Sequence, residues 1–389
     1  MDEFDMEELN ETFAESGFLN VFLNTSNVST NFNDSSLSNV NDNYFEEFGE
    51  DILLPKWIIG LYFSFVLIGT GMDLVYVLAL LKNKRNGTFS LILQLTLIDA
   101  VSPFLATIEI LTINDRTWTF SPKTCPIYNG TEILLNSLQL WIIICMNFHV
   151  ISLWNLLKNE SQKKTKNPLI SCDDESNECL VTKRENTRVM CIDYRRRRDD
   201  VSVAIPSILI WLFCTSLSIP SFTFSSILKL KQNFVVCALV DKYYDHMFQI
   251  LLLVFRVLLP VPLLLFSLIF LIVKLSKTSL KDIKHILTKD FAELRILLIF
   301  CVCLTILYLC TSFQRNLFQF LHVNSHVLYD LSENFKVPPL YNNHLNITSN
   351  MSLTMLHYSC NTLRAVLLLY LLPDFKNLVK KSVFGCKKR

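Results

Sequence analysis

The 389-residue chain has few charged residues and few glycines. Asp, Glu, Lys and Arg together make up 18% of it, whereas a globular domain carries about 25%. Only 8 residues are glycine, 51% are hydrophobic, and the mean hydropathy is +0.35. This composition excludes an ordinary soluble protein.

Signatures of common enzymes are missing as well. The sequence contains no Gly-rich phosphate loop, no His-Glu-x-x-His and no nucleophile elbow. Cys172, Cys179 and Cys191 share one loop, but their spacing matches no common zinc pattern. We therefore expect neither an enzyme nor a protein that needs a metal or another cofactor, and we expect no nucleic-acid partner.

The first 50 residues contain no Lys or Arg and no long apolar run, so we expect no secretory signal peptide there. Residues 1–55 contain thirteen acids and no base. This favours a disordered, glycosylated extracellular tail; an acidic cytosolic tail is the alternative. Four glycosylation sequons lie in the tail, at Asn10, Asn24, Asn27 and Asn33.

Seven apolar segments follow the tail. Each reaches the roughly 20 residues that a helix needs to cross about 30 Å of hydrocarbon. Helices are expected because lipid offers the backbone no hydrogen-bond partners. The sequence therefore predicts an all-α membrane protein, a seven-transmembrane-helix bundle over 56–372, with segments at 56–81, 88–112, 127–157, 201–223, 246–274, 292–320 and 351–372.

Basic residues alternate between the two sides of this bundle. Twenty-six of the 36 Lys and Arg lie in loops on the side of the C-terminus, eleven of them in the long loop 158–200. By the positive-inside rule, the N-terminus is outside and the C-terminus inside, as expected of a multi-pass plasma-membrane protein. Two more sequons, at Asn346 and Asn350, then face outside. The basic loop would contact anionic lipid or an acidic partner, or is a solvated linker.

Several short motifs match those of one known family of seven-helix membrane proteins. Leu95-Thr96-Leu97-Ile98-Asp99 stands where that family has Leu-Ala-x-x-Asp in its second helix, and Trp118-Thr119-Phe120, just before Cys125, matches the Trp-x-Phe of its first outer loop. The fourth and fifth segments carry a tryptophan and prolines where that family has them, at Trp211, Pro220 and Pro260. In this order and spacing, the chain resembles the rhodopsin-like (class A) G-protein-coupled receptors.

The resemblance implies a receptor that binds an extracellular ligand and signals to a heterotrimeric G protein. It also implies a disulfide between Cys125 and Cys237, which suits an oxidising extracellular face. Pro373-Asp374-Phe375-Lys376 looks like the start of the short amphipathic eighth helix, so 373–389 would be that helix and a cytoplasmic tail. Cys386 is then a palmitoylation site.

The departures from the family pattern concern its activation machinery. His149-Val150-Ile151 stands at the inner switch positions, where the family has Asp-Arg-Tyr. Leu304-Thr305-Ile306 replaces Trp-x-Pro, and Arg364-Ala365 replaces Asn-Pro. The scaffold is kept while the switch is altered, which suggests a receptor-derived binding protein that does not signal as one alternative function.

Asp99 lies in the middle of the second segment, where the family binds a sodium ion. The alignment puts Gln139 and Arg364 at the neighbouring positions. We hypothesise that Arg364 replaces the ion by pairing with Asp99; the alternative is that Arg364 extends to the inner interface.

A second group of polar residues lies nearer the outer side. Glu132 stands where amine receptors of the family carry their Asp, so it could hold a ligand ammonium, and Arg256 would suit a carboxylate or carbonyl. Alternatively, Glu132 and Arg256 satisfy each other. Because the group carries both signs of charge, a peptide is favoured over a monoamine anchored by Glu132. The residues expected to line this cavity are Glu109, Glu132, Arg256, Arg315, His357 and Tyr358.

A third class of protein also has seven helices. An insect-type chemoreceptor channel would place the N-terminus inside the cell, opposite to the orientation that the basic loops predict.

Overall fold

The structure is a computed structural model of the full chain. It describes residues 54–82, 87–115, 117–166, 203–229, 235–239, 242–277, 289–323 and 343–372, with positions 376 and 379. Several predictions concern residues outside these ranges: the sequons at Asn10, Asn24, Asn27 and Asn33, most of the loop 158–200 with its three cysteines, and the region of Cys386.

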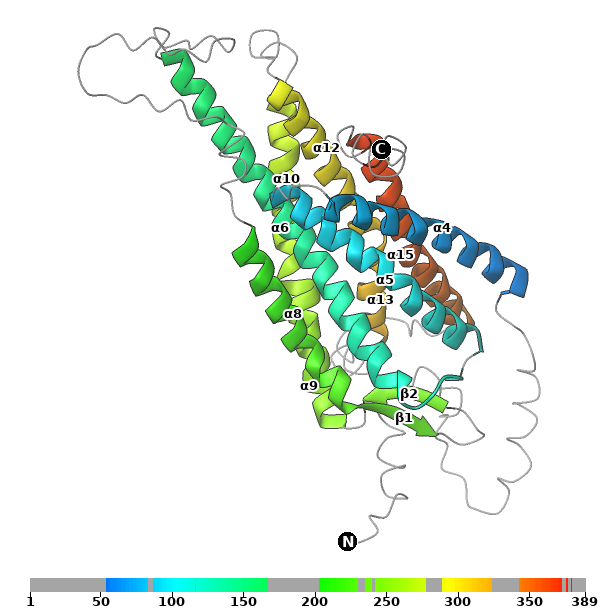
Figure 1. The fold of residues 1–389 in the computed structure, drawn as a ribbon. Helices are drawn as coiled ribbons and strands as arrows, with labels where there is room; N and C mark the ends of the chain where they lie inside the picture. The colour runs from blue at the N-terminus through cyan, green and yellow to red at the C-terminus, as the bar shows by residue number, and fades with distance from the viewer. Residues whose placement is uncertain are drawn as a thin grey trace, which may run out of the picture.

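The described chain is almost entirely helical (Figure 1). In chain order the elements are α4 (Lys56–Leu81), α5 (Gly87–Asp115), α6 (Thr124–Lys166), α8 (Ala204–Phe224), β1 (Ser225–Lys229), β2 (Val235–Leu239), α9 (Lys242–Leu253), the π-helix η2 (Val254–Leu258), α10 (Pro260–Lys277), α12 (Lys289–Cys310), α13 (Ser312–Val323) and α15 (Asn343–Leu371).

Six helical stretches in the described part of the chain are long and apolar enough to cross a membrane. They correspond to the first six segments that the sequence predicts. The 29-residue α15 corresponds to the seventh but is not among the six; its middle carries His357, Asn361 and Arg364. The protein is therefore of the all-α, multi-pass membrane class.

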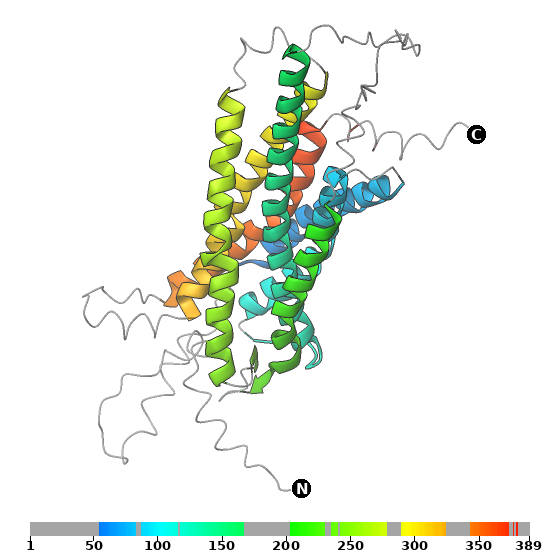
Figure 2. The ribbon, with the colours of Figure 1, turned by 90° about the vertical axis from the view of Figure 1, so that its left-hand side faces the viewer.

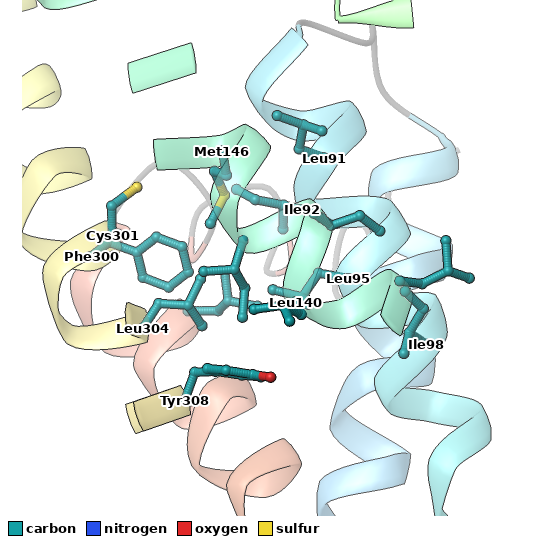
Figure 3. Packing of buried hydrophobic residues seen from close by; sticks show 14 of the residues in the cluster. Leu91, Ile92, Leu95, Ile98, Leu140, Met146, Phe300, Cys301, Leu304 and Tyr308 are labelled. Atoms are coloured by element: carbon teal, nitrogen blue, oxygen red, sulfur yellow. The ribbon is translucent and has the colours of Figure 1, made fainter. Parts of the chain in front are cut away.

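The helix α6 lies at the centre of the bundle, in contact with α5, α8, α10 and α12 (Figure 2). Apolar side chains from α5, α6 and α12 meet in its core, among them Leu95, Met146 and Phe300, all nearly or fully buried (Figure 3). On the outside, large apolar side chains such as Phe104 and Ile205 remain exposed. An apolar exterior of this extent suits contact with lipid.

Two helices are interrupted where the sequence predicts continuous segments. Before Pro260 the chain forms the π-helix η2, in which the Leu259 N–H donates to the Val254 carbonyl over 2.9 Å. The other break separates α12 from α13 at Thr311 without any proline. There the Thr311 hydroxyl donates to the Leu307 carbonyl over 2.7 Å, a side-chain bond that often bends helices.

One end of the bundle is covered by the antiparallel hairpin of β1 and β2, and we call it the hairpin end. A disulfide joins Cys125, the second residue of α6, to Cys237 on β2, with their Cα atoms 5.6 Å apart. Trp118 packs against this disulfide, and its backbone N–H donates to the Val235 carbonyl over 2.7 Å. The hairpin is thus fixed to the start of α6.

Two glycines allow neighbouring helices to approach closely. A Cβ atom at Gly69 of α4 would lie 2.9 Å from the Cα of Thr362 in α15, and one at Gly130 of α6 would overlap the ring of Phe222. Gly60 and Gly71 of α4 have no such neighbour within 4 Å. Gly69 therefore sets the distance between α4 and α15, and Gly130 sets the distance between α6 and α8.

Candidate functional site

Charged side chains from four parts of the bundle form ion pairs beneath the hairpin end. We call Glu109, Glu132, Arg256 and Arg315, with their hydrogen-bond partners, the hairpin-end cluster. Glu109 of α5 accepts hydrogen bonds from Arg315 (2.5 Å), Thr354 (3.1 Å) and Tyr358 (2.7 Å). Three donors satisfy a buried carboxylate, so Glu109 is held firmly between α5, α13 and α15.

Glu132 of α6 has a different set of partners. Its Oε1 accepts from Asn136 Nδ2 at 2.5 Å and from Arg315 Nη1 at 3.1 Å. Arg256 Nη2 lies 3.5 Å from the same oxygen. Asn136 stands one helical turn after Glu132, so it supports the carboxylate from within α6.

Arg315 of α13 joins the two acids. One of its terminal nitrogens contacts Glu109 and the other contacts Glu132, and its guanidinium carbon lies 5.7 Å from the centre of the Tyr358 ring. Burial of a charge is costly unless it is paired and hydrogen-bonded. Two acids and two bases balance here, so the cluster is neutral as a whole.

Exposure varies across the hairpin-end cluster. The side chains of Arg315 and Glu109 are 1% and 6% exposed, whereas those of Arg256 and Glu132 are 11% and 12% exposed. Arg256 Nη2 is also without a hydrogen bond. Glu132 and Arg256 therefore form the looser and more accessible edge of the cluster.

The six residues that the sequence assigned to one outer cavity all lie in this region. Five of them are joined by ion pairs and hydrogen bonds. Glu132 and Arg256 lie within ion-pair distance, which is the alternative in which these two residues satisfy each other. His357 lies beside Tyr358, and its Nδ1 is 2.8 Å from Ser312 Oγ. Sequence reasoning missed Asn136 and Thr354, which carry no charge and stand out only by their contacts with the acids.

A second cluster lies deeper in the bundle, about 10 Å along α6 from the first, since seven residues separate Glu132 from Gln139. Arg364 of α15 holds Asp99 of α5 through two hydrogen bonds, Nε to Oδ2 at 2.9 Å and Nη2 to Oδ1 at 2.7 Å. Both side chains are 1% exposed. The structure thus contains the pair proposed from the sequence.

The remaining polar groups around this pair complete what we call the mid-bundle cluster: Asp99, Arg364, Gln139, Asn361 and Ser102. Arg364 also donates to Asn361, which in turn donates to Ser102. The Gln139 amide donates to Asp99 Oδ1 at 3.3 Å, or, turned over, accepts from Arg364. The turned orientation is preferable because it gives the guanidinium another acceptor.

Asp73 of α4 is a further acid next to this cluster. It is 1% exposed, and neither carboxyl oxygen has a hydrogen-bond partner. Asp73 belongs to none of the sites predicted from the sequence, although an acid in the middle of an apolar helix is a signal for a functional site.

The inner switch positions are packed into the bundle. Val150 is fully buried, Ile151 is partly buried, and the His149 Nε2 lies 3.3 Å from the Thr88 hydroxyl of α5. Two residues before His149, Asn147 donates to Ser267 at 3.0 Å and to Thr305 at 2.9 Å. An amide therefore links α6 to α10 and α12 here.

Other predicted sites are placed only in part. Asn350 lies within α15, and its side-chain oxygen is buried without a partner. Asn346 also falls in α15, but its side chain is outside the described part, as is Cys386. Among the described residues, no group of three or more His, Cys, Asp or Glu could hold a metal ion.

No protein-family model matches the chain, and no curated protein matches it.

Proposed function

We propose that the protein is a plasma-membrane receptor that binds an extracellular ligand at its hairpin end. The observation that carries this proposal is the hairpin-end cluster itself. Charged side chains within membrane helices are expensive and usually serve a function. Here four of them gather from four helical elements, beneath a disulfide-linked hairpin, and one edge of the cluster is accessible.

The orientation and the number of crossings belong to the same proposal. We take α15 as the seventh crossing, because it runs alongside α4, α5 and α12 and carries partners for both clusters. The distribution of Lys and Arg among the loops favours an orientation with the hairpin end outside the cell and the opposite end inside. A disulfide at the hairpin end agrees with an oxidising exterior.

The favoured ligand is a peptide, such as a neuropeptide, that offers both a cation and an acceptor. Its amine or guanidinium would take the place of Arg256 at Glu132, while its carboxylate or carbonyl would accept from Arg256. The exchange leaves every charge paired, so the ligand avoids the large cost of isolating a buried charge. Ligand binding would then separate η2 from α6.

Signalling would pass through the inner, basic side of the bundle to a heterotrimeric G protein. The link of Asn147 to Ser267 and Thr305 joins α6 to α10 and α12 close to His149. A ligand that moves η2 would shift α10, which continues directly from η2. This shift would strain the hydrogen bonds of Asn147. The hydrogen bonds of Asn147 and the resemblance to rhodopsin-like receptors support this proposed route.

Topology is the first test of the proposal. Glycosidase treatment of the full-length protein should lower its apparent mass, and antibody labelling of intact cells should detect a tag at the N-terminus but not one at the C-terminus. Sugar on the first 35 residues also excludes a chemoreceptor channel with a cytosolic N-terminus. A C-terminal tag at the surface would overturn the proposal.

A screen of secreted peptides, with calcium and cyclic-nucleotide readouts, tests ligand and signalling together. For an agonist found in this way, Glu132→Gln should raise the concentration needed for a response while surface expression persists, and the charge reversal Glu132→Lys should abolish the response. Phe104→Ala serves as the matched control, since Phe104 is exposed on the lipid side. Unchanged potency in both Glu132 variants would remove this residue from the ligand site.

A receptor-derived protein that binds without signalling is the second candidate function. It is favoured by Val150, which is buried and apolar where the family resemblance expects an arginine. Direct measurement of nucleotide exchange on purified G proteins separates the two: a bound peptide without exchange supports the second candidate. If only monoamines bind, the alternative of an amine receptor anchored by Glu132 is correct instead.

A further inference from the structure

Asp73 is a buried acid without a partner in the part of the chain that the structure describes. It lies on α4, which packs against both α5 and α15. Its side chain is 1% exposed, and both oxygens lack a hydrogen bond. The charged groups that act on it from the two packed helices are Asp99 of α5 and Arg364 of α15.

The donors of Arg364, Asn361 and Tyr76 are engaged elsewhere. Arg364 directs Nε and Nη2 to Asp99 and Nη1 to the sulfur of Cys360 at 3.2 Å. The amide of Asn361 donates to Ser102. On α4 itself, one turn further along, the Tyr76 hydroxyl donates to the Ala365 carbonyl at 3.2 Å.

The charges around Asp73 do not balance. Two carboxylates, Asp73 and Asp99, share one guanidinium, and Arg364 gives both of its acid-facing hydrogen bonds to Asp99. An ionised carboxylate without a partner is too costly inside a bundle, and such a group takes up a proton instead. A metal ion is a weaker choice, because the oxygens of Asp99 and Asn361 already accept from Arg364.

We propose that Asp73 is a proton-binding site: in the folded protein its carboxyl group is protonated and therefore neutral, and it lies beside the ion pair of Asp99 and Arg364. Loss of this proton would place a second negative charge beside Asp99. Asp73 would then compete for Arg364 and loosen the bond between α5 and α15. The proton therefore keeps the mid-bundle cluster in its present arrangement.

Infrared spectroscopy of the purified full-length protein in lipid nanodiscs tests the proposal directly. At neutral pH, the difference spectrum between wild type and Asp73→Asn should contain the carbonyl stretch of a protonated carboxylic acid. Asp73→Glu should shift this band and keep it. A difference spectrum that shows only carboxylate bands would refute the proposal.

Thermal unfolding at different pH values gives a second readout. The folded protein holds a proton that the unfolded chain releases above about pH 3.9. Stability of the wild type, relative to Asp73→Asn, should therefore fall as pH rises, by up to tenfold in the unfolding equilibrium per pH unit. The fall ends where Asp73 also loses its proton in the folded protein. Parallel pH profiles of the two proteins would contradict a bound proton.

Sodium is distinguished from the proton in the same preparation. Replacing choline chloride by sodium chloride at constant ionic strength should leave the difference between the melting temperatures of wild type and Asp73→Asn unchanged. If sodium raises the melting temperature of wild type alone, the site binds a metal ion and the proton proposal fails. If Asp73→Asn does not fold, the infrared measurement proceeds with Asp73→Glu against wild type, and an acid carbonyl band that does not shift between the two proteins would refute the proposal.

Discussion

Both polar clusters neutralise charged side chains that are buried in the bundle, but they differ in how exposed those side chains are. The hairpin-end cluster pairs two acids with two bases, and its edge of Glu132 and Arg256 is accessible and loosely bonded. The mid-bundle cluster is sealed, and its guanidinium is fully used by Asp99 and its neighbours. On the proposed function, the accessible edge would exchange its partner for a ligand, whereas the sealed pair would stay fixed.

The difference follows from the helices that supply each base. Arg256 stands on the π-helix η2, an irregular turn of a kind often found at functional sites. Arg364 stands in the continuous helix α15 and meets Asp99 with a planar fork of two hydrogen bonds, which fixes geometry as well as charge. The loosely bonded base and the firmly bonded one therefore stand on different backbone geometries.

The largest expected effect is at the mid-bundle cluster. Arg364→Ala strands a buried Asp99 and should cost about 3–5 kcal/mol of stability, enough to lower surface expression strongly. Adding Asp99→Asn should restore much of the loss, because no ionised acid is then left. Thermal unfolding in nanodiscs and surface expression measure both. No rescue by the double variant would count against the pair.

An intermediate effect is expected where α4 and α15 approach each other beside this cluster. Gly69→Ala pushes a Cβ against the backbone of Thr362, two residues before Arg364, and should cost about 1–3 kcal/mol. Gly71→Ala is the matched control on the same helix, since its Cβ meets nothing within 4 Å. Melting temperatures of the two variants give the comparison; equal values would show that the helices can separate freely.

The smallest effect is expected at the accessible edge. A double-mutant cycle for Glu132 and Arg256 should give a coupling near the lower end of the range of about 0.5–3 kcal/mol seen for contacting residues. The cycle for Glu109 and Arg315, which are more buried and 2.5 Å apart, should give a larger value. If the two couplings are equal or reversed, the proposed exchangeable edge is wrong.

The sequence predicted the helical membrane class because apolar runs of this length can be satisfied in lipid only as helices. The first six segments are found, most with ends shifted by a few residues; α6 begins at Thr124 and continues to Lys166, well beyond the predicted end at 157. The interruptions were not predicted. Pro260 signals a distortion, but no residue type announces the break at Thr311, which depends on a hydroxyl bond to the preceding turn.

The candidate residues of both clusters were identifiable because charges in apolar helices are rare. Their partners were less clear: the sequence left open whether Glu132 binds Arg256 or a ligand, and it gave no place to Asp73. Neutral partners such as Asn136 and Thr354 resemble ordinary helix residues in the sequence. Only the packing of α5, α6 and α15 assigns them to the acids.

By itself, the sequence determined the class of protein, the positions of charged residues along its helices and the cysteines that can pair at its hairpin end. Hydropathy, charge and cysteine position are local properties of the chain. Tertiary structure decided which acid takes which base and which acid is left without one. The reason is geometric: a guanidinium has a limited number of donors, and their directions are fixed only when the helices have packed.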